Sequence, residues 1–257
     1  MVILLLILSL LISSCSVNSL DKKVDTDSSI KIGGIISKNM VLAGRVTIEK
    51  DLLIAKGVLV EIEKATEIIV EKSDISRTEP IFLMPETEIV VEGTLIIKGS
   101  KEKPVRIYSS DSSDINWGGI IINGGSVKSE NLEIRNSYNA FNVIKGSLYI
   151  KDFRITNNKI GISILDNESP SIIEKGHFSA NESAVINNSE KSKFVDVLVE
   201  NNEEGVLLKR CPDMILHLTS RKNHYGIITN TQCINFNLIN MSIYENKNNI
   251  VFADFSN

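Results

Sequence analysis

The 257-residue chain is poor in aromatic side chains, in cysteine and in histidine. Only 5% of its residues are aromatic although 42% are hydrophobic, so its interior must be built mainly from aliphatic side chains. It contains no dense block of Lys or Arg, and its formal net charge is −4. Nucleic acid is therefore not expected as a partner, because domains that bind it normally concentrate positive charge.

The sequence also lacks the familiar spacings of metal and catalytic sites. The three histidines, His177, His217 and His224, show no HxH or HxxxH pattern, whereas a zinc site normally needs three convergent protein ligands. There is no Gly-rich phosphate loop and no Ser, His and Asp arrangement of hydrolytic type. We therefore expect no metal and no cofactor, and the sequence gives little support to an enzyme.

What the chain does contain is a repeat. An Asn, replaced once by Ser, returns at intervals of 21 or 23 residues. Three positions later comes a small or turn-tolerant residue, and the residue after that is always apolar. Chance does not readily produce three such columns, so the chain is a repeat protein. The polar column consists of Asn116, Ser137, Asn158, Asn181, Asn202, Asn223 and Asn246.

A period of this length fits a coil of short strands better than two helices and a turn. Side chains alternate in residues 161–164 and 205–208, and again in residues 132–134 before the polar column. Coils stacked at about 4.7–4.9 Å would align the amides in a hydrogen-bonded ladder beside an apolar interior. The sequence thus predicts an all-β, single-stranded right-handed parallel β-helix over residues 31–257, with the handedness taken from the rule for parallel crossovers. The Asn ladder is then structural.

Two parts of the chain resemble known β-helix proteins. The segment that runs from Gly93 through the Gly99–Pro104 turn to Trp117 resembles the opening coils of a family of bacterial extracytoplasmic β-helix proteins. The downstream half, with its Asn, Gly and Ile columns, resembles repeats shared by polysaccharide-acting enzymes of the pectate-lyase type and by the periplasmic accessory protein of nitrous oxide reductase. The resemblance covers about residues 40–255 and implies the fold, but one fold hosts many functions.

The N-terminus resembles a bacterial lipoprotein signal. Residues 2–12 are apolar and uncharged, shorter than the roughly 20 residues that span a bilayer, and they lead into small residues as a signal-peptide core does. Residues 12–15, Ile-Ser-Ser-Cys, resemble a lipobox in which Cys15 carries a lipid. We expect a signal peptide at 1–14 and a lipidated, flexible tether at 15–30.

This N-terminus implies attachment to a membrane through the lipid on Cys15, in the cell envelope. Ser16 stands where an inner-membrane retention signal usually has Asp, which favours the outer membrane or the cell surface. An ordinary cleaved signal with a coincidental cysteine is the alternative, because no Lys or Arg precedes the apolar run.

Cys211 and Cys233 are 22 residues apart, which is one coil. Stacked coils would place their Cα atoms about 4.8 Å apart, inside the range of roughly 4.4–6.8 Å that a disulfide accepts. The spacing therefore fits a disulfide in an oxidising compartment, and it equally fits two buried free thiols.

The candidates for chemistry lie in one loop, where Asp111 and Asp114 precede Trp117. A glycosidase needs two carboxyl groups roughly 5–10 Å apart, and Trp117 beside them would offer a sugar-stacking platform. Packing of Trp117 over the next coil is the favoured interpretation, because Trp is usually mostly buried.

The leading hypothesis is a lipid-anchored binding or structural module that contacts polysaccharide or an envelope protein. The alternatives are a polysaccharide lyase, hydrolase or epimerase and, more remotely, a periplasmic accessory factor for metalloenzyme maturation. An enzyme predicts a groove lined by several acidic and aromatic groups. A scaffold predicts a shallow face of mixed Lys, Glu and Asn.

Overall fold

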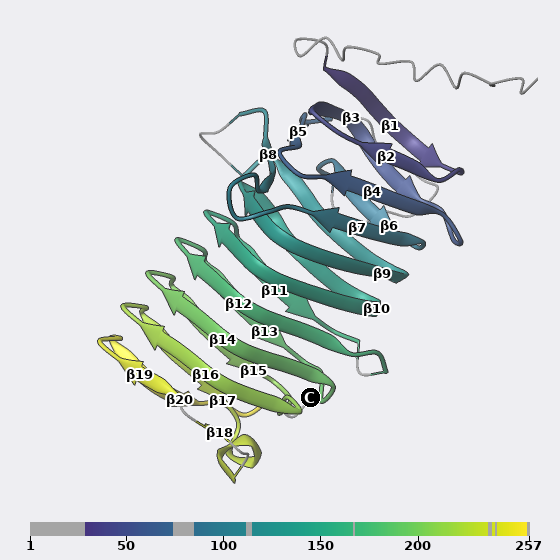
Figure 1. Ribbon diagram of the computed structural model, residues 1–257. Helices are drawn as coiled ribbons and strands as arrows, with labels where there is room; N and C mark the ends of the chain where they lie inside the picture. The colour runs from purple at the N-terminus through teal and green to yellow at the C-terminus, as the bar shows by residue number, and fades with distance from the viewer. Residues whose placement is uncertain are drawn as a thin grey trace, which may run out of the picture.

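The computed structural model describes residues 29–73, 85–111, 115–166, 168–235, 238–239 and 241–255. They form a parallel β-solenoid of about nine turns, with no α-helix in the described part of the chain. Figure 1 shows the coils stacked along one axis, from β1 (Ile30–Ile36) at one end to β19 (Ser242–Tyr244) and β20 (Asn248–Phe252) at the other. The all-β parallel solenoid expected from the repeat is confirmed.

The expected signal peptide, the lipidation site at Cys15 and nearly all of the tether lie outside the described residues. Among the residues that are described, no helix is long and apolar enough to cross a membrane.

Each complete coil contributes three strand segments, and each segment pairs in parallel with its counterpart in the next coil. The solenoid therefore has three faces, here named A, B and C in chain order. Several long strands bend around corners and take part in two or three faces. These are β1 and β3 (Arg45–Ile54) on B and C, β9 (Trp117–Arg135) and β10 (Ser137–Thr156) on all three, and β12 (Ser171–Ser179), β14 (Ser192–Glu200) and β16 (Met214–Arg221) on A and B.

The remaining strands belong to one face each. Face A is completed by β2 (Met40–Leu42), β4 (Leu59–Glu63), β7 (Thr94–Lys98) and β18 (Leu238–Ile239). Face B is completed by β5 (Glu67–Val70), β8 (Val105–Ser109) and β19. Face C is completed by β6 (Glu88–Val91), β11 (Ile160–Ile164), β13 (Ser183–Asn187), β15 (Glu204–Leu208), β17 (Tyr225–Thr229) and β20.

From Asn131 onward, two of the three corners are made by single residues with left-handed backbone. Between faces A and B this residue is Asn131 in one coil and Asp152 in the next, with φ near 50° in both. Asn and Asp tolerate this conformation better than most residues. The same A–B corner is formed further on by Lys175, Asp196 and His217, and the B–C corner by Asn136, Asn157, Ala180, Asn201, Lys222 and Glu245.

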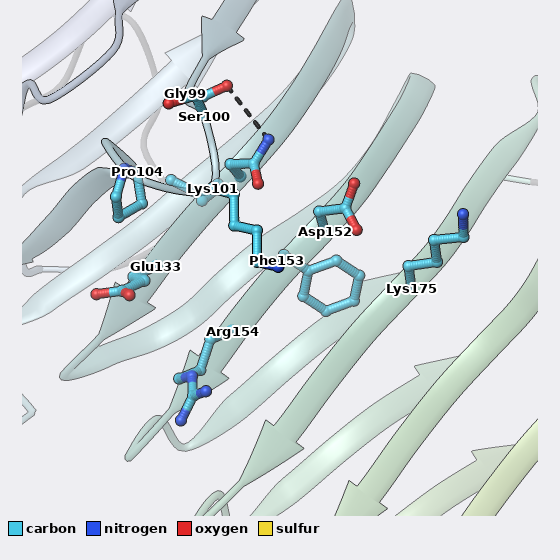
Figure 2. A pocket seen from close by; sticks show the side chains of 11 residues that line it. Gly99, Ser100, Lys101, Pro104, Glu133, Asp152, Phe153, Arg154 and Lys175 are labelled. Atoms are coloured by element: carbon cyan, nitrogen blue, oxygen red, sulfur yellow. Dashed lines mark hydrogen bonds between the residues drawn. The ribbon is translucent and has the colours of Figure 1, made fainter.

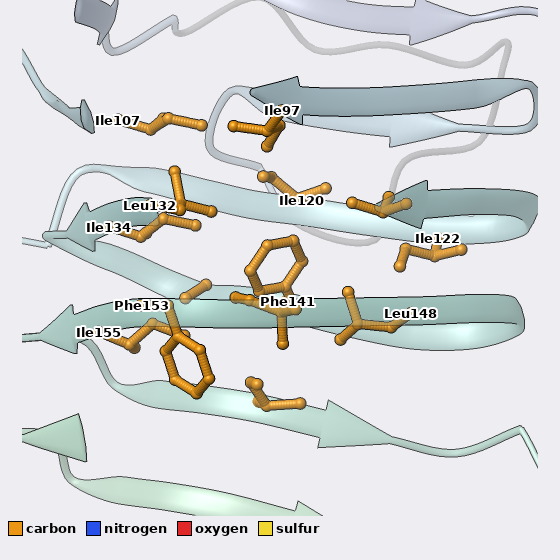
Figure 3. Close-up of a cluster of buried hydrophobic side chains, with 14 of the residues drawn as sticks. Ile97, Ile107, Ile120, Ile122, Leu132, Ile134, Phe141, Leu148, Phe153 and Ile155 are labelled. Atoms are coloured by element: carbon orange, nitrogen blue, oxygen red, sulfur yellow. The ribbon is translucent and has the colours of Figure 1, made fainter. Parts of the chain in front are cut away.

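The interior is a continuous aliphatic column, as the low aromatic content predicts. Figure 3 shows side chains from successive coils packed between the faces, among them Ile120, Phe141 and Ile134. In the register of face C, Ile120 lies beside Phe141 and Phe141 beside Ile162, and all three are fully buried. The apolar column read from the sequence is therefore the core-facing column of face C.

The Asn ladder begins each strand of face C in the later coils. The amide oxygen of Asn181 accepts from the backbone N–H and from the side-chain amide of Asn158, both at 3.0 Å. Asn202 accepts the same two bonds from Asn181, each at 2.9 Å. The pattern continues through Asn223 to Asn246. Each buried amide is thus satisfied by the neighbouring coil, which accounts for the repeat in structural terms.

The prediction of Asn116 as the first member of the polar column is wrong by one residue. Ser137 does join the ladder, since its N–H and its hydroxyl both donate to Asn158, but the register places Trp117, and not Asn116, opposite Ser137. Asn116 instead donates its backbone N–H to the corner residue Asn136. The shift arises because Gly119 pairs with Asn139, so that Ala140 has no counterpart in the preceding strand.

Cys211 and Cys233 form a disulfide with a Cα–Cα distance of 5.2 Å. Cys233 belongs to a short 3-10 helix, η1 (Thr231–Asn235), in the connection from face C to face A. The bridge therefore ties this connection to the corresponding one in the preceding coil. Of the two alternatives that the sequence left open, a disulfide or two free thiols, the structure contains the disulfide.

Candidate functional site

The loop before β9 does not form the site that the sequence suggested. Asp111 is exposed and Asp114 lies outside the described residues, so no carboxylate pair is described there. Trp117 is fully buried and its indole N–H donates to the carbonyl of Arg135 at 3.1 Å. A ring with no open face cannot stack on a sugar, so the alternative of a stacking platform is wrong. Trp117 is packed into the coil, as the favoured interpretation has it.

A hollow lined by charged side chains lies instead at the A–B corner. Where the next coil has the single residue Asn131 between the paired positions of faces A and B, this coil has the six residues Gly99 to Pro104. This insertion, named here the corner loop, is closed by two backbone hydrogen bonds of 3.0 Å between Ser100 and Lys103. It is fastened to the neighbouring coil because Gly99 donates to the carbonyl of Glu130 and accepts from the Asn131 amide.

A hollow of about 590 Å³ lies between the corner loop and the three coils that follow it. We name it the corner groove. Figure 2 shows Lys101 of the loop reaching over Phe153, with Asp152 and Lys175 on one side and Arg154 on the other. The groove is lined by Gly99, Ser100, Lys101, Pro104, Asn131, Leu132, Glu133, Asp152, Phe153, Arg154 and Lys175.

The floor of the corner groove is continuous with the core. Phe153 is only 5% exposed, and its ring meets Phe178 edge-on with centroids 5.1 Å apart. Its neighbour in the following coil is Gly176, where a Cβ atom would lie 1.8 Å from the ring. The absence of a side chain at Gly176 is what leaves room for the ring, so the floor is held rigidly.

The charges of the groove are only partly compensated. Glu133 is engaged by Arg106 at 3.0 Å, and Lys175 lies 3.9 Å from Glu174. Lys101, Asp152 and Arg154 are exposed and have no ion pair among the described residues. The groove thus combines Lys, Arg, Asp, Glu and Asn side chains on an open surface.

A second hollow of about 740 Å³ lies beside the disulfide-bonded connection and the last described coil. Lys209 and Arg210 line it together with Phe252, which is 54% exposed. Arg210 is paired with Glu190 at 3.3 Å, and Asn230 is occupied in capping η1, where it accepts from the N–H groups of Gln232 and Cys233.

The histidines are engaged in pairs with acidic residues. His217 lies 2.8 Å from Asp196 and His224 lies 2.8 Å from Glu203. His177 lies 3.1 Å from Glu200, which also holds Arg221 at 2.8 Å. Within the described ranges no group of three or more His, Cys, Asp or Glu side chains is arranged to hold a metal ion.

The environment of His177 predicts a loss of stability on acidification. Burial lowers the pKa of His177, and nearby Arg154 and Arg221 lower it further, against the opposing effect of Glu200. The folded state therefore binds a proton less readily than the unfolded state, whose histidine pKa is about 6.5, and the free energy of unfolding should fall as the pH drops below that value.

Urea unfolding at pH 7.5 and pH 5.5 checks this expectation, with His177→Gln as the comparison. The variant should lose less stability between the two pH values than the wild-type chain. Equal losses in both proteins would contradict the assignment of this pH dependence to His177.

Comparison of the chain with protein-family models, with curated proteins and with solved structures finds no match in any of the three.

Proposed function

We propose that the chain is a lipid-anchored protein of the bacterial cell envelope whose solenoid serves as a module that binds polysaccharide. The observation that carries the proposal is the corner groove, an open hollow on a rigid scaffold whose unpaired polar groups face solvent. Rigid scaffolds favour binding because little conformational entropy is lost on association. Lipidation at Cys15 and an outer-membrane or surface location are supported by the lipobox-like residues 12–15 and the polar segment that follows them.

An extended polymer suits this geometry better than a small ligand does. Small-molecule pockets usually enclose most of their ligand, whereas the corner groove is open and follows the solenoid axis across several coils. Asp152 lies next to Lys175 in the register of successive coils, and Asn131 precedes both. Coils repeat at about 4.8 Å, a step comparable to the length of one sugar unit in an extended chain.

Glycan-array binding by the soluble form that begins at Ser16, together with reducing-end and unsaturated-product assays on the same sugars, tests the proposal. Binding without turnover is the expected result. Turnover would overturn the proposal in favour of an enzyme, and the absence of any bound glycan would overturn it in favour of a protein partner. Partition of the full chain into detergent, lost in Cys15→Ser, is expected if the lipid is present, and unchanged partition would contradict the anchor.

A further inference from the structure

The corner groove carries more free positive charge than the chain as a whole. Among its lining residues are three cations, Lys101, Arg154 and Lys175, and two carboxylates, Glu133 and Asp152. Two partners lie outside the lining: Arg106 is 3.0 Å from Glu133, and Glu174 is 3.9 Å from Lys175. Lys101, Arg154 and Asp152 remain without an ion pair among the described residues. The groove is therefore net positive on a chain whose formal net charge is −4.

The cations follow the solenoid axis. Lys101 belongs to the corner loop, Arg154 lies two coils further on and Lys175 lies in the coil after that. Their backbone positions are spread over three coil steps of about 4.8 Å each, and the side chain of Lys101 reaches over Phe153 toward the later coils (Figure 2). The cations therefore lie along one open surface, which a chain polymer can follow. Arg154 adds a planar guanidinium, the side chain best suited to grip carboxylate or phosphate through two parallel hydrogen bonds.

Asp152 narrows the class of ligand. It lies between the cations at the A–B corner, is exposed and forms no ion pair among the residues that are described. A carboxylate in a cationic groove repels a bare polyanion but accepts hydrogen bonds from hydroxyl groups. A chain that carries both hydroxyl and acidic groups satisfies Asp152 and the cations together.

We infer that the corner groove binds an acidic polysaccharide, with its acidic groups on Lys101, Arg154 and Lys175 and its hydroxyl groups on Asp152. This inference rests on the proposed function and adds to it the charge of the ligand and the residues that select it. Because these pairs are exposed, each contributes modestly and is screened by salt.

Alginate, polyphosphate and neutral dextran serve as the three probes, with binding measured by titration calorimetry at low salt on the form that begins at Ser16. Alginate should bind more tightly than polyphosphate, which lacks hydroxyl groups along its chain, and dextran should bind most weakly. Lys101→Gln and Arg154→Gln should each weaken alginate binding about fivefold, and added NaCl should weaken it further.

Lys222→Gln is the matched control, because Lys222 is also exposed, lacks a partner among the described residues and sits at the B–C corner. It should leave alginate binding unchanged, and thermal unfolding should show that all three variants fold. Alginate binding that is equal in all variants would overturn the assignment to this groove while leaving polysaccharide recognition intact. Tighter binding of polyphosphate or dextran would overturn the acidic sugar, and failure of every polysaccharide to bind would overturn the proposed function as well.

Discussion

Replacement of Asn181 by Ala is expected to destabilise the solenoid by about 4 kcal/mol. Asn181 is 4% exposed, and its amide makes four hydrogen bonds. It accepts two from Asn158 and donates one to the carbonyl of Ile155 and one to Asn202. Ala would leave buried donors and acceptors in two neighbouring coils without partners, and each such group costs about 1–3 kcal/mol.

Asn246→Ala provides the control within the same column. Asn246 accepts two hydrogen bonds from Asn223, but it lies in the last described coil and is partly exposed, so water can replace the lost amide. We expect a cost of about 1 kcal/mol in urea unfolding monitored by circular dichroism. A cost below 1 kcal/mol for Asn181→Ala, or equal costs at the two positions, would show that the ladder is not a main source of stability.

Gly176→Val is expected to destabilise the chain by about 3 kcal/mol. A Cβ atom at this position would lie 1.8 Å from the ring of Phe153, and the ring is held in place by its edge-on contact with Phe178. Either the ring leaves its position or the two coils move apart. Because Phe153 is the floor of the corner groove, the same substitution should also weaken ligand binding.

The second substitution Phe153→Leu should restore much of this loss. The same core column contains Leu132 before Phe153 and Val197 after Gly176, so a Leu and Val pair fits the pattern of the neighbouring coils. In a double-mutant cycle, the Phe153→Leu/Gly176→Val chain should be more stable than the sum of the single changes predicts, by at least about 1 kcal/mol. Simple additivity would contradict the proposed exchange of volume between the two positions.

The parts of the fold that repeat were predictable from the sequence. An inward apolar residue such as Ile162 and a ladder residue such as Asn181 recur because each coil must satisfy the next, so the periodicity itself carries the structural information. The corner residues were not predictable in the same way. Lys175 and Ala180 occupy left-handed backbone that their residue types do not indicate, because the neighbouring coils impose it.

Two features could not be predicted from the spacing of residues: the register at Trp117 and the corner groove. The register at Trp117 depends on the unpaired position of Ala140, which shifts the column by one residue and cannot be seen in spacing alone. The corner groove depends on six residues, Gly99 to Pro104, in the place of Asn131, and the turn-like composition of this segment does not show that it borders a groove. The cations Lys101, Arg154 and Lys175 are distant in sequence and come together only through the register of the coils.

Hydrogen exchange of the amides in residues 99–104, measured with and without bound alginate, tests the corner groove most directly. The N–H groups of Gly99, Ser100 and Lys103 are hydrogen-bonded, whereas Lys101 and Glu102 lie at the exposed tip of the loop, so exchange in the free protein should be fastest at Lys101 and Glu102. We expect alginate to slow exchange in residues 99–104, with little change in residues 209–213 and 252–255 around the second hollow. Protection confined to the second hollow, or no slowing in residues 99–104 while alginate is bound, would contradict the corner groove as the binding site.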